Sequence, residues 1–100
     1  MPAIQLNHAG RKASTGCFAV GYDGQNVPEE AGGWPTMAPS EIAFGGLRTP
    51  RALSVDEIHG LVGAFAVAAG RAVAAGFQAI QIHAAHGYLI SQFLDPLSNE

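Results

Sequence analysis

The sequence carries little charge for a domain of its size. Of its 100 residues, five are basic and eight are acidic, and the formal net charge is −3. Soluble domains usually carry about 25% charged residues, and this chain carries 13%. We therefore expect much of the chain's surface to be buried in a larger body or at an interface, such as that of a homo-oligomer. Five basic residues cannot form an extended positive patch, which argues against a nucleic-acid partner.

Cysteine and long apolar runs are also scarce. Cys17 is the only cysteine, so a disulfide within the chain is impossible and a reducing compartment is expected. The opening MPAIQLNHAG lacks the basic segment and apolar core of a secretory signal. The longest uncharged apolar stretch, at 60–70, is shorter than the roughly 20 residues of a membrane span. We therefore expect a cytoplasmic protein with no membrane partner.

Phosphate-binding and nucleophile-elbow motifs are missing, since no GxGxxG, P-loop or GxSxG pattern occurs. What the sequence does contain is a recognisable order of elements. We predict a strand at 3–7, a buried strand at 77–82 and a short helix at 88–94. Residues 8–38 are rich in glycine and show no period, so we predict a long loop that lies over another part of the protein.

A long helix is predicted at 55–75. Ser54 and Glu57 have the spacing of a capping box, and Gly76 suits the position just after the last turn. The other faces carry alanine and glycine rather than charge, so we expect the helix to pack on more than one side. Its apolar stripe consists of Ile58, Val62, Phe65, Ala69 and Val73.

The fold class follows from this order of elements. A strand, a helix and a second strand parallel to the first form a βαβ unit. Two strands cannot close a sheet, and a parallel sheet is covered on both faces, whereas this chain supplies one long helix. We therefore predict an α/β fold that is a piece of a larger domain.

Polar residues follow both predicted strands. Ligand sites in parallel α/β folds lie at the carboxyl ends of the strands, and neighbouring parallel strands end at the same edge. We therefore expect these side chains to lie close together. They are Gln5, Asn7 and His8 after the first strand, and His83, His86 and Tyr88 after the second.

The motif His83-Ala-Ala-His86-Gly-Tyr88 is the strongest chemical candidate. In a helical turn, residues three apart share a face, so both imidazoles could donate an N–H to one carbonyl or phenolate oxygen. Tyr88 could then donate a proton to a basic carbon formed during a reaction. Two alternatives stay open at this point. Both histidines could be satisfied structural residues, or they could bind zinc, although no third ligand is evident.

Other polar residues have simpler interpretations from sequence alone. Gln5 could face solvent on an exposed strand edge. Arg11 and Lys12 are expected to be solvated charges in a loop, His59 a surface residue of the helix, and Cys17 incidental.

Two segments resemble a known family. IQLNHAGRKAS (4–14) and AGFQAIQIHAAHGYLISQFLDPLSN (75–99) resemble the old yellow enzyme family of FMN-dependent ene-reductases and NADPH dehydrogenases. APSEIAF (38–44) and the long helix also fit, so the resemblance covers nearly the whole chain. HxxH together with HAGRKA is similar to the branch that includes bacterial NADPH dehydrogenases and xenobiotic reductases.

The resemblance implies a (β/α)8 TIM barrel with FMN at its carboxyl-terminal mouth, in which this chain would supply the third and fourth strands. It also implies that NADPH or NADH reduces FMN, which passes hydride to the β-carbon of an α,β-unsaturated carbonyl compound. Gln5 would contact the flavin, and Tyr88 would protonate the α-carbon. The substrate-binding residues would be His83, Ala84, Ala85, His86 and Tyr88.

Length sets a limit on this expectation. A complete barrel needs about 250 residues, and this sequence has 100. We therefore expect residues 1–100 to be a fragment of a single FMN-binding barrel domain. The alternative is a truncated, catalytically inactive remnant of such an enzyme.

Overall fold

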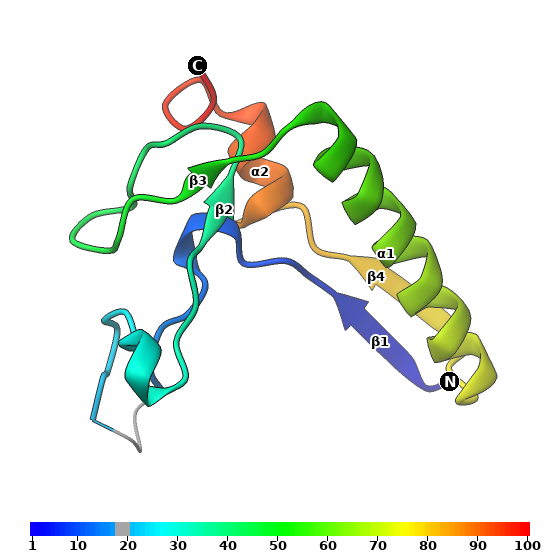
Figure 1. The fold of residues 1–100 in the computed structure, drawn as a ribbon. Helices are drawn as coiled ribbons and strands as arrows, with labels where there is room; N and C mark the ends of the chain where they lie inside the picture. The colour runs from blue at the N-terminus through cyan, green and yellow to red at the C-terminus, as the bar shows by residue number, and fades with distance from the viewer. Residues whose placement is uncertain (18–20) are drawn as a thin grey trace.

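The computed structural model describes residues 1–17 and 21–100 (Figure 1). The predicted loop at 8–38 includes residues 18–20, which lie outside the described residues. In chain order the elements are strand β1 (Ala3–Leu6), 3-10 helices η1 (Gly10–Lys12) and η2 (Glu29–Ala31), strands β2 (Met37–Ala38) and β3 (Arg51–Ala52), helix α1 (Val55–Ala74), strand β4 (Ala79–Ile82) and helix α2 (Leu89–Leu94).

The centre of the fold is a βαβ unit. Strands β1 and β4 pair in parallel, with Gln5 opposite Gln81, and α1 runs beside them in the opposite direction (Figure 1). His83 extends the pairing beyond β4, because its backbone N–H donates to the Leu6 carbonyl at 2.9 Å. The predicted parallel βαβ order is confirmed, and it places the carboxyl ends of both strands at one edge.

The start of α1 is fixed by the capping box. The Ser54 hydroxyl accepts from the Glu57 backbone N–H at 3.2 Å, and the Glu57 carboxylate accepts from the Ser54 N–H at 2.8 Å. Arg51 adds two bonds to the same carboxylate, at 2.9 and 2.8 Å. Two free backbone donors of the first turn are thereby satisfied, as the sequence predicted.

The end of α1 explains where β4 begins. Gly76 has a φ of +94°, a conformation that favours glycine. Its N–H donates to Val73 and the N–H of Phe77 to Ala72, which is the Schellman pattern. Phe77 therefore belongs to the helix cap, and the prediction that the strand starts at residue 77 is wrong by two residues.

The apolar stripe of α1 is only partly covered. None of its five residues is fully buried, and Val62 and Val73 are 64% and 62% exposed; the one buried residue of α1 is Ala72, outside the stripe. By length and composition α1 could also cross a membrane, with a mean hydropathy of 1.2 over 18 residues, contrary to the expectation of no such segment. A helix that is apolar all round is equally typical of the interior of a large protein.

The segment predicted as one loop contains short regular elements. It includes η1, η2 and β2, and β2 pairs in parallel with β3. The prediction of a loop without secondary structure is therefore wrong at these places. Strands of two residues are too short to show a period of two in the sequence.

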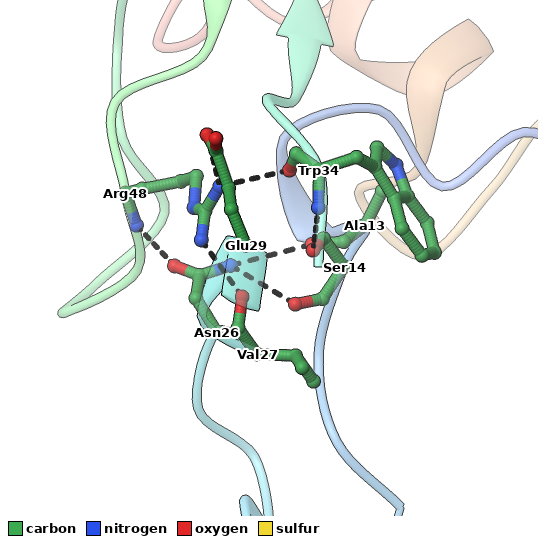
Figure 2. A network of polar contacts seen from close by, with 7 residues as sticks. All are labelled: Ala13, Ser14, Asn26, Val27, Glu29, Trp34 and Arg48. Atoms are coloured by element: carbon green, nitrogen blue, oxygen red, sulfur yellow. Dashed lines mark hydrogen bonds and ion pairs between the residues drawn. The ribbon is translucent and has the colours of Figure 1, made fainter. Parts of the chain in front are cut away.

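Arg48 binds residues in the second half of this segment (Figure 2). Its guanidinium donates to the carbonyls of Trp34 and Val27, each at 2.9 Å, and its backbone N–H donates to the Asn26 side chain. The buried Ser14 hydroxyl accepts from the Trp34 N–H at 2.9 Å. Polar contacts therefore hold Ser14, Asn26, Val27 and Trp34 of this segment in place.

Candidate active site at the strand ends

The paired strands present two amides at their exposed face. Gln5 Nε2 donates to Gln81 Oε1 at 2.8 Å, as the strand register places them side by side. These amides and the segment His83–His86 line a cavity of about 190 Å³. Gln81 was not singled out from the sequence, although its position two residues before the histidine motif marks the same strand face.

His83 has a defined orientation and a defined tautomer. Its Nδ1 accepts a hydrogen bond from the Ala85 backbone N–H at 3.1 Å. In a neutral imidazole with an accepting Nδ1, the proton resides on Nε2. His83 can therefore donate a hydrogen bond from Nε2 to a ligand.

His86 approaches His83 by a route that differs from the prediction. The segment is no helical turn, because His86 has a φ of +57° and Gly87 a φ of +71°, both in the left-handed region. The two imidazole centroids still lie 5.2 Å apart, edge to face, and the His83 and Tyr88 ring centroids lie 5.1 Å apart. The three side chains thus form one cluster. We call the left-handed segment at His86 and Gly87, which brings them together, the reversed turn.

Tyr88 is positioned by the start of α2, where it is the N-cap residue. Its N–H donates to the Ala85 carbonyl at 3.2 Å, and the next N–H, of Leu89, donates to the His8 carbonyl at 2.9 Å. Leu89 is 3% exposed. This anchored helix end connects the second strand's turn to the segment that follows β1.

Gln92 joins the turns after the two strands from beneath, and the sequence analysis missed it. Its side chain is 1% exposed. Nε2 donates to the carbonyls of Gly87 at 2.8 Å and Ala9 at 3.3 Å, and Oε1 accepts from the Arg11 N–H at 3.3 Å. The only available signal was a polar residue within the apolar run LISQFL.

Gly10 makes room for this joint. It has a φ of +57°, and a Cβ at this position would lie 2.3 Å from Gln92 Oε1. The glycine is therefore required both by its backbone conformation and by the close approach of the Gln92 amide. We call the contacts of Ala9, Gly10, Arg11 and Gly87 with Gln92 the amide clasp.

The two cations after β1 are not simply solvated, contrary to expectation. Arg11 is 9% exposed, and its Nη1 donates to the Ile42 carbonyl at 3.1 Å. Lys12 Nζ donates to the His86 carbonyl at 2.8 Å. His59 is exposed, as expected, and Cys17 is exposed too.

Asn7 and His8 do not join the histidine cluster. They line a different cavity, of about 160 Å³, with Leu61 and Phe65 of α1. His8 Nδ1 accepts from the Gly10 N–H at 3.0 Å, and burial lowers the pKa of His8 from its usual 6.5. The expectation that all six polar residues share one edge therefore holds for Gln5, the two clustered histidines and Tyr88.

A metal site is not supported by the described part of the chain. Within residues 1–17 and 21–100, no group of three His, Cys, Asp or Glu side chains could hold a metal ion. The cluster of two imidazoles and a phenol instead suits an oxygen acceptor that can take several hydrogen bonds.

Comparison with known proteins identifies the family. A model of the NADH:flavin oxidoreductase / NADH oxidase family matches residues 2–100. The chain belongs to this family.

Three curated relatives illustrate the match. The chain is 49% identical over 102 residues to the NADH:flavin oxidoreductase FG08077 of Gibberella zeae, covering 97% of this chain and 24% of that protein. It is 50% identical over 98 residues to an NADPH dehydrogenase of Clostridium acetobutylicum, covering 97% and 24%. The corresponding values for an NADPH dehydrogenase of Halalkalibacterium halodurans are 44% over 98 residues, covering 98% and 24%. The chain spans about a quarter of the length of these relatives.

Proposed function

We propose that this chain supplies the substrate-binding wall of an FMN-dependent ene-reductase, which uses NADPH or NADH to reduce the C=C bond of α,β-unsaturated carbonyl compounds. The observation that carries the proposal is the cluster of His83, His86 and Tyr88 at the carboxyl end of a parallel strand, beside Gln5. Membership of a flavin oxidoreductase family supports it.

The same proposal gives the βαβ unit its place in a larger fold. Strands β1 and β4 would be neighbouring strands of a TIM barrel, the third and fourth, with α1 in the outer ring of helices. Two features support this: the strands are parallel, and ligand sites of such barrels lie at the carboxyl ends of their strands. The exposed faces of α1 are then covered by neighbouring helices.

The residues present fit a flavin ring at this edge. The Gln5 and Gln81 amides each offer a donor and an acceptor at the cavity, and Ala84 and Ala85 add apolar surface beside them. A flat heteroaromatic ring needs this combination, an apolar surface and amide partners for its polar edge. Gln5 would hold the ring, and bound FMN would supply the hydride chemistry.

His83 and His86 would bind and polarise the substrate. The Nε2–H of His83 is free to donate to a carbonyl oxygen, because Nδ1 is occupied by the Ala85 N–H. The ring centroids of His83 and His86 lie 5.2 Å apart, so both imidazoles can donate a hydrogen bond to one oxygen atom. Hydrogen bonds to that oxygen stabilise the negative charge that develops there as the β-carbon is reduced. Ala84 and Ala85 line the same cavity without adding bulk.

Tyr88 would complete the reduction. The centroids of the Tyr88 and His83 rings lie 5.1 Å apart, so the Tyr88 hydroxyl would reach the substrate that His83 binds. The hydroxyl gives its proton to the α-carbon, and Tyr88 regains a proton from solvent. Hydride on one carbon and a proton on the other balance the addition of two electrons and two protons.

A chimaera provides the test, with residues 1–100 replacing the matching segment of the clostridial NADPH dehydrogenase. In Tyr88→Phe, enone reduction by the reduced flavin should slow by about a hundredfold, because the proton donor is lost. Flavin reduction by NADPH should keep its rate, since it needs no proton from Tyr88. Stopped-flow absorbance measures the two half-reactions separately. Equal slowing of both, or of neither, would contradict the role of Tyr88.

The second candidate is the inactive remnant that the sequence analysis left as an alternative. Expression of residues 1–100 alone separates the two. Yellow protein whose flavin absorbance survives desalting would contradict the remnant. A colourless, aggregating product would favour it for the chain by itself.

A further inference from the structure

Lys12 reaches from the turn after β1 to the turn after β4. It is the only lysine in the sequence, and its Nζ donates to the His86 carbonyl oxygen at 2.8 Å. The same Nζ lies 5.1 Å from the centroid of the Tyr88 ring and 4.3 Å from that of Phe44. The ammonium group thus contacts the backbone of one proposed site residue and the ring of another.

The carbonyl that Lys12 binds belongs to the residue whose backbone sets the cluster. His86 has a φ of +57°, a backbone conformation that residues with a Cβ rarely adopt, and Gly87 follows with a φ of +71°. A residue in such a conformation persists only when surrounding contacts hold it. This reversed turn directs the His86 imidazole toward His83, so whatever holds the turn also sets the distance between the imidazoles.

Two side chains hold two successive carbonyls of the turn, in different environments. Gln92 binds the Gly87 carbonyl at 2.8 Å from the buried side and is 1% exposed. Lys12 binds the His86 carbonyl at an exposed position. Loss of the Gln92 contact leaves buried groups without partners, whereas water can solvate the His86 carbonyl when Lys12 is lost. Lys12 therefore adds little to folding and more to the orientation of the cluster.

We propose that Lys12 is a positioning residue that holds the His86–Tyr88 turn, through the His86 carbonyl and the Tyr88 ring, in the arrangement that binds the substrate oxygen. This inference rests on the proposed function. It assigns Lys12 no contact with substrate. Its effect passes through the bound carbonyl and through the attraction of an ammonium group for the face of an aromatic ring.

The test uses the chimaera and three variants. Lys12→Met removes the charge and the donor but keeps the stem, Lys12→Arg keeps charge and donor, and Arg71→Met removes an exposed cation from α1 as a control. The readouts are the dissociation constant of a simple phenol, followed by flavin absorbance, the rates of the two half-reactions, and the thermal midpoint.

We expect Lys12→Met to bind the phenol at least about tenfold more weakly and to slow enone reduction, with the rate of flavin reduction by NADPH unchanged. Its thermal midpoint should stay within about 2 °C of the parent. Lys12→Arg should restore binding to within about threefold, and Arg71→Met should match the parent. A crystal structure of Lys12→Met should show His86 outside the left-handed region.

Contrary results are separable from failure of the proposed function. Phenol binding and rates in Lys12→Met equal to the parent would overturn the positioning role. So would a fall of several degrees in the thermal midpoint with both half-reactions slowed equally, since that result indicates a structural role. If the parent chimaera binds no phenol and reduces no enone, the proposed function itself is overturned.

Discussion

The turns after strands β1 and β4 differ from the long helix α1 in how far they are held by contacts within the chain. At the strand ends, Gln92 is 1% exposed, and the amide clasp joins two distant turns. On α1, by contrast, Val62, Val67 and Val73 are more than half exposed. The turns after the strands are therefore held by contacts inside these 100 residues, while much of the apolar surface of α1 has no partner within the described residues.

The exposed apolar side chains of α1 carry a cost in free energy. An exposed valine forgoes roughly 1.5 kcal/mol of burial free energy, and α1 has several. A cavity of about 390 Å³ also lies between α1, the paired strands and α2, lined by Phe65, Ile80 and other apolar side chains. Polar contacts to backbone compensate elsewhere, as in the Arg48 network (Figure 2). The geometry of the candidate site thus depends on polar contacts, whereas the stability of the whole fold depends on apolar burial.

The largest expected effect comes from breaking the amide clasp with Gly10→Ala. The new Cβ would lie 2.3 Å from Gln92 Oε1, and residue 10 has a φ of +57°. We expect a loss of about 3 kcal/mol in the free energy of unfolding, from backbone strain and from the displaced amide. Chemical denaturation of the chimaera measures this.

Gly45→Ala is the matched control. Gly45 has a similar φ of +52°, but its Cβ would meet no atom within 4 Å. It should cost only the strain of the left-handed conformation, about 1 kcal/mol. Equal losses in the two variants would show that Gln92 does not restrict residue 10.

A smaller effect is expected at the start of α1 on acidification. The hydrogen bonds from Arg51, and then from the Ser54 backbone, lower the pKa of Glu57 from 4.5 to about 2. Because the folded value lies below the unfolded one, this stabilisation is complete above about pH 4.5 and disappears as the pH falls toward 2. Glu57 is exposed, so salt screens the effect.

Thermal midpoints at several acidic pH values check this. The parent should lose more stability than Glu57→Gln between about pH 5 and about pH 3. A parallel decline in both proteins would exclude Glu57 as the cause. The amide clasp should keep its geometry through this range, because its contacts involve only backbone groups and the Gln92 amide.

Short local signals were enough to predict the frame of the fold. Ser54 and Glu57 defined the start of α1, Gly76 defined its end, and the polar residues after each strand predicted a shared edge. Cytoplasmic location, self-association and the roles of the site residues stay predictions.

Contacts between distant segments could not be predicted. Lys12 and Gln92 bind backbone groups 74 and 83 residues away, and no local pattern reports such pairs. A spacing of three between His83 and His86 fits a helical turn and a left-handed turn equally well, and the choice depends on tertiary contacts. The separation of His8 from the cluster has a similar origin, since His8 lines a cavity with Leu61 and Phe65 of α1.

The central claim is that the reversed turn presents two imidazoles to one oxygen atom. Titration of the chimaera with a phenol tests it most directly, in the parent and in the His83→Ala, His86→Ala double variant. We predict a change in flavin absorbance in the parent and a dissociation constant at least about tenfold larger in the double variant. The same dissociation constant in both proteins would contradict the account.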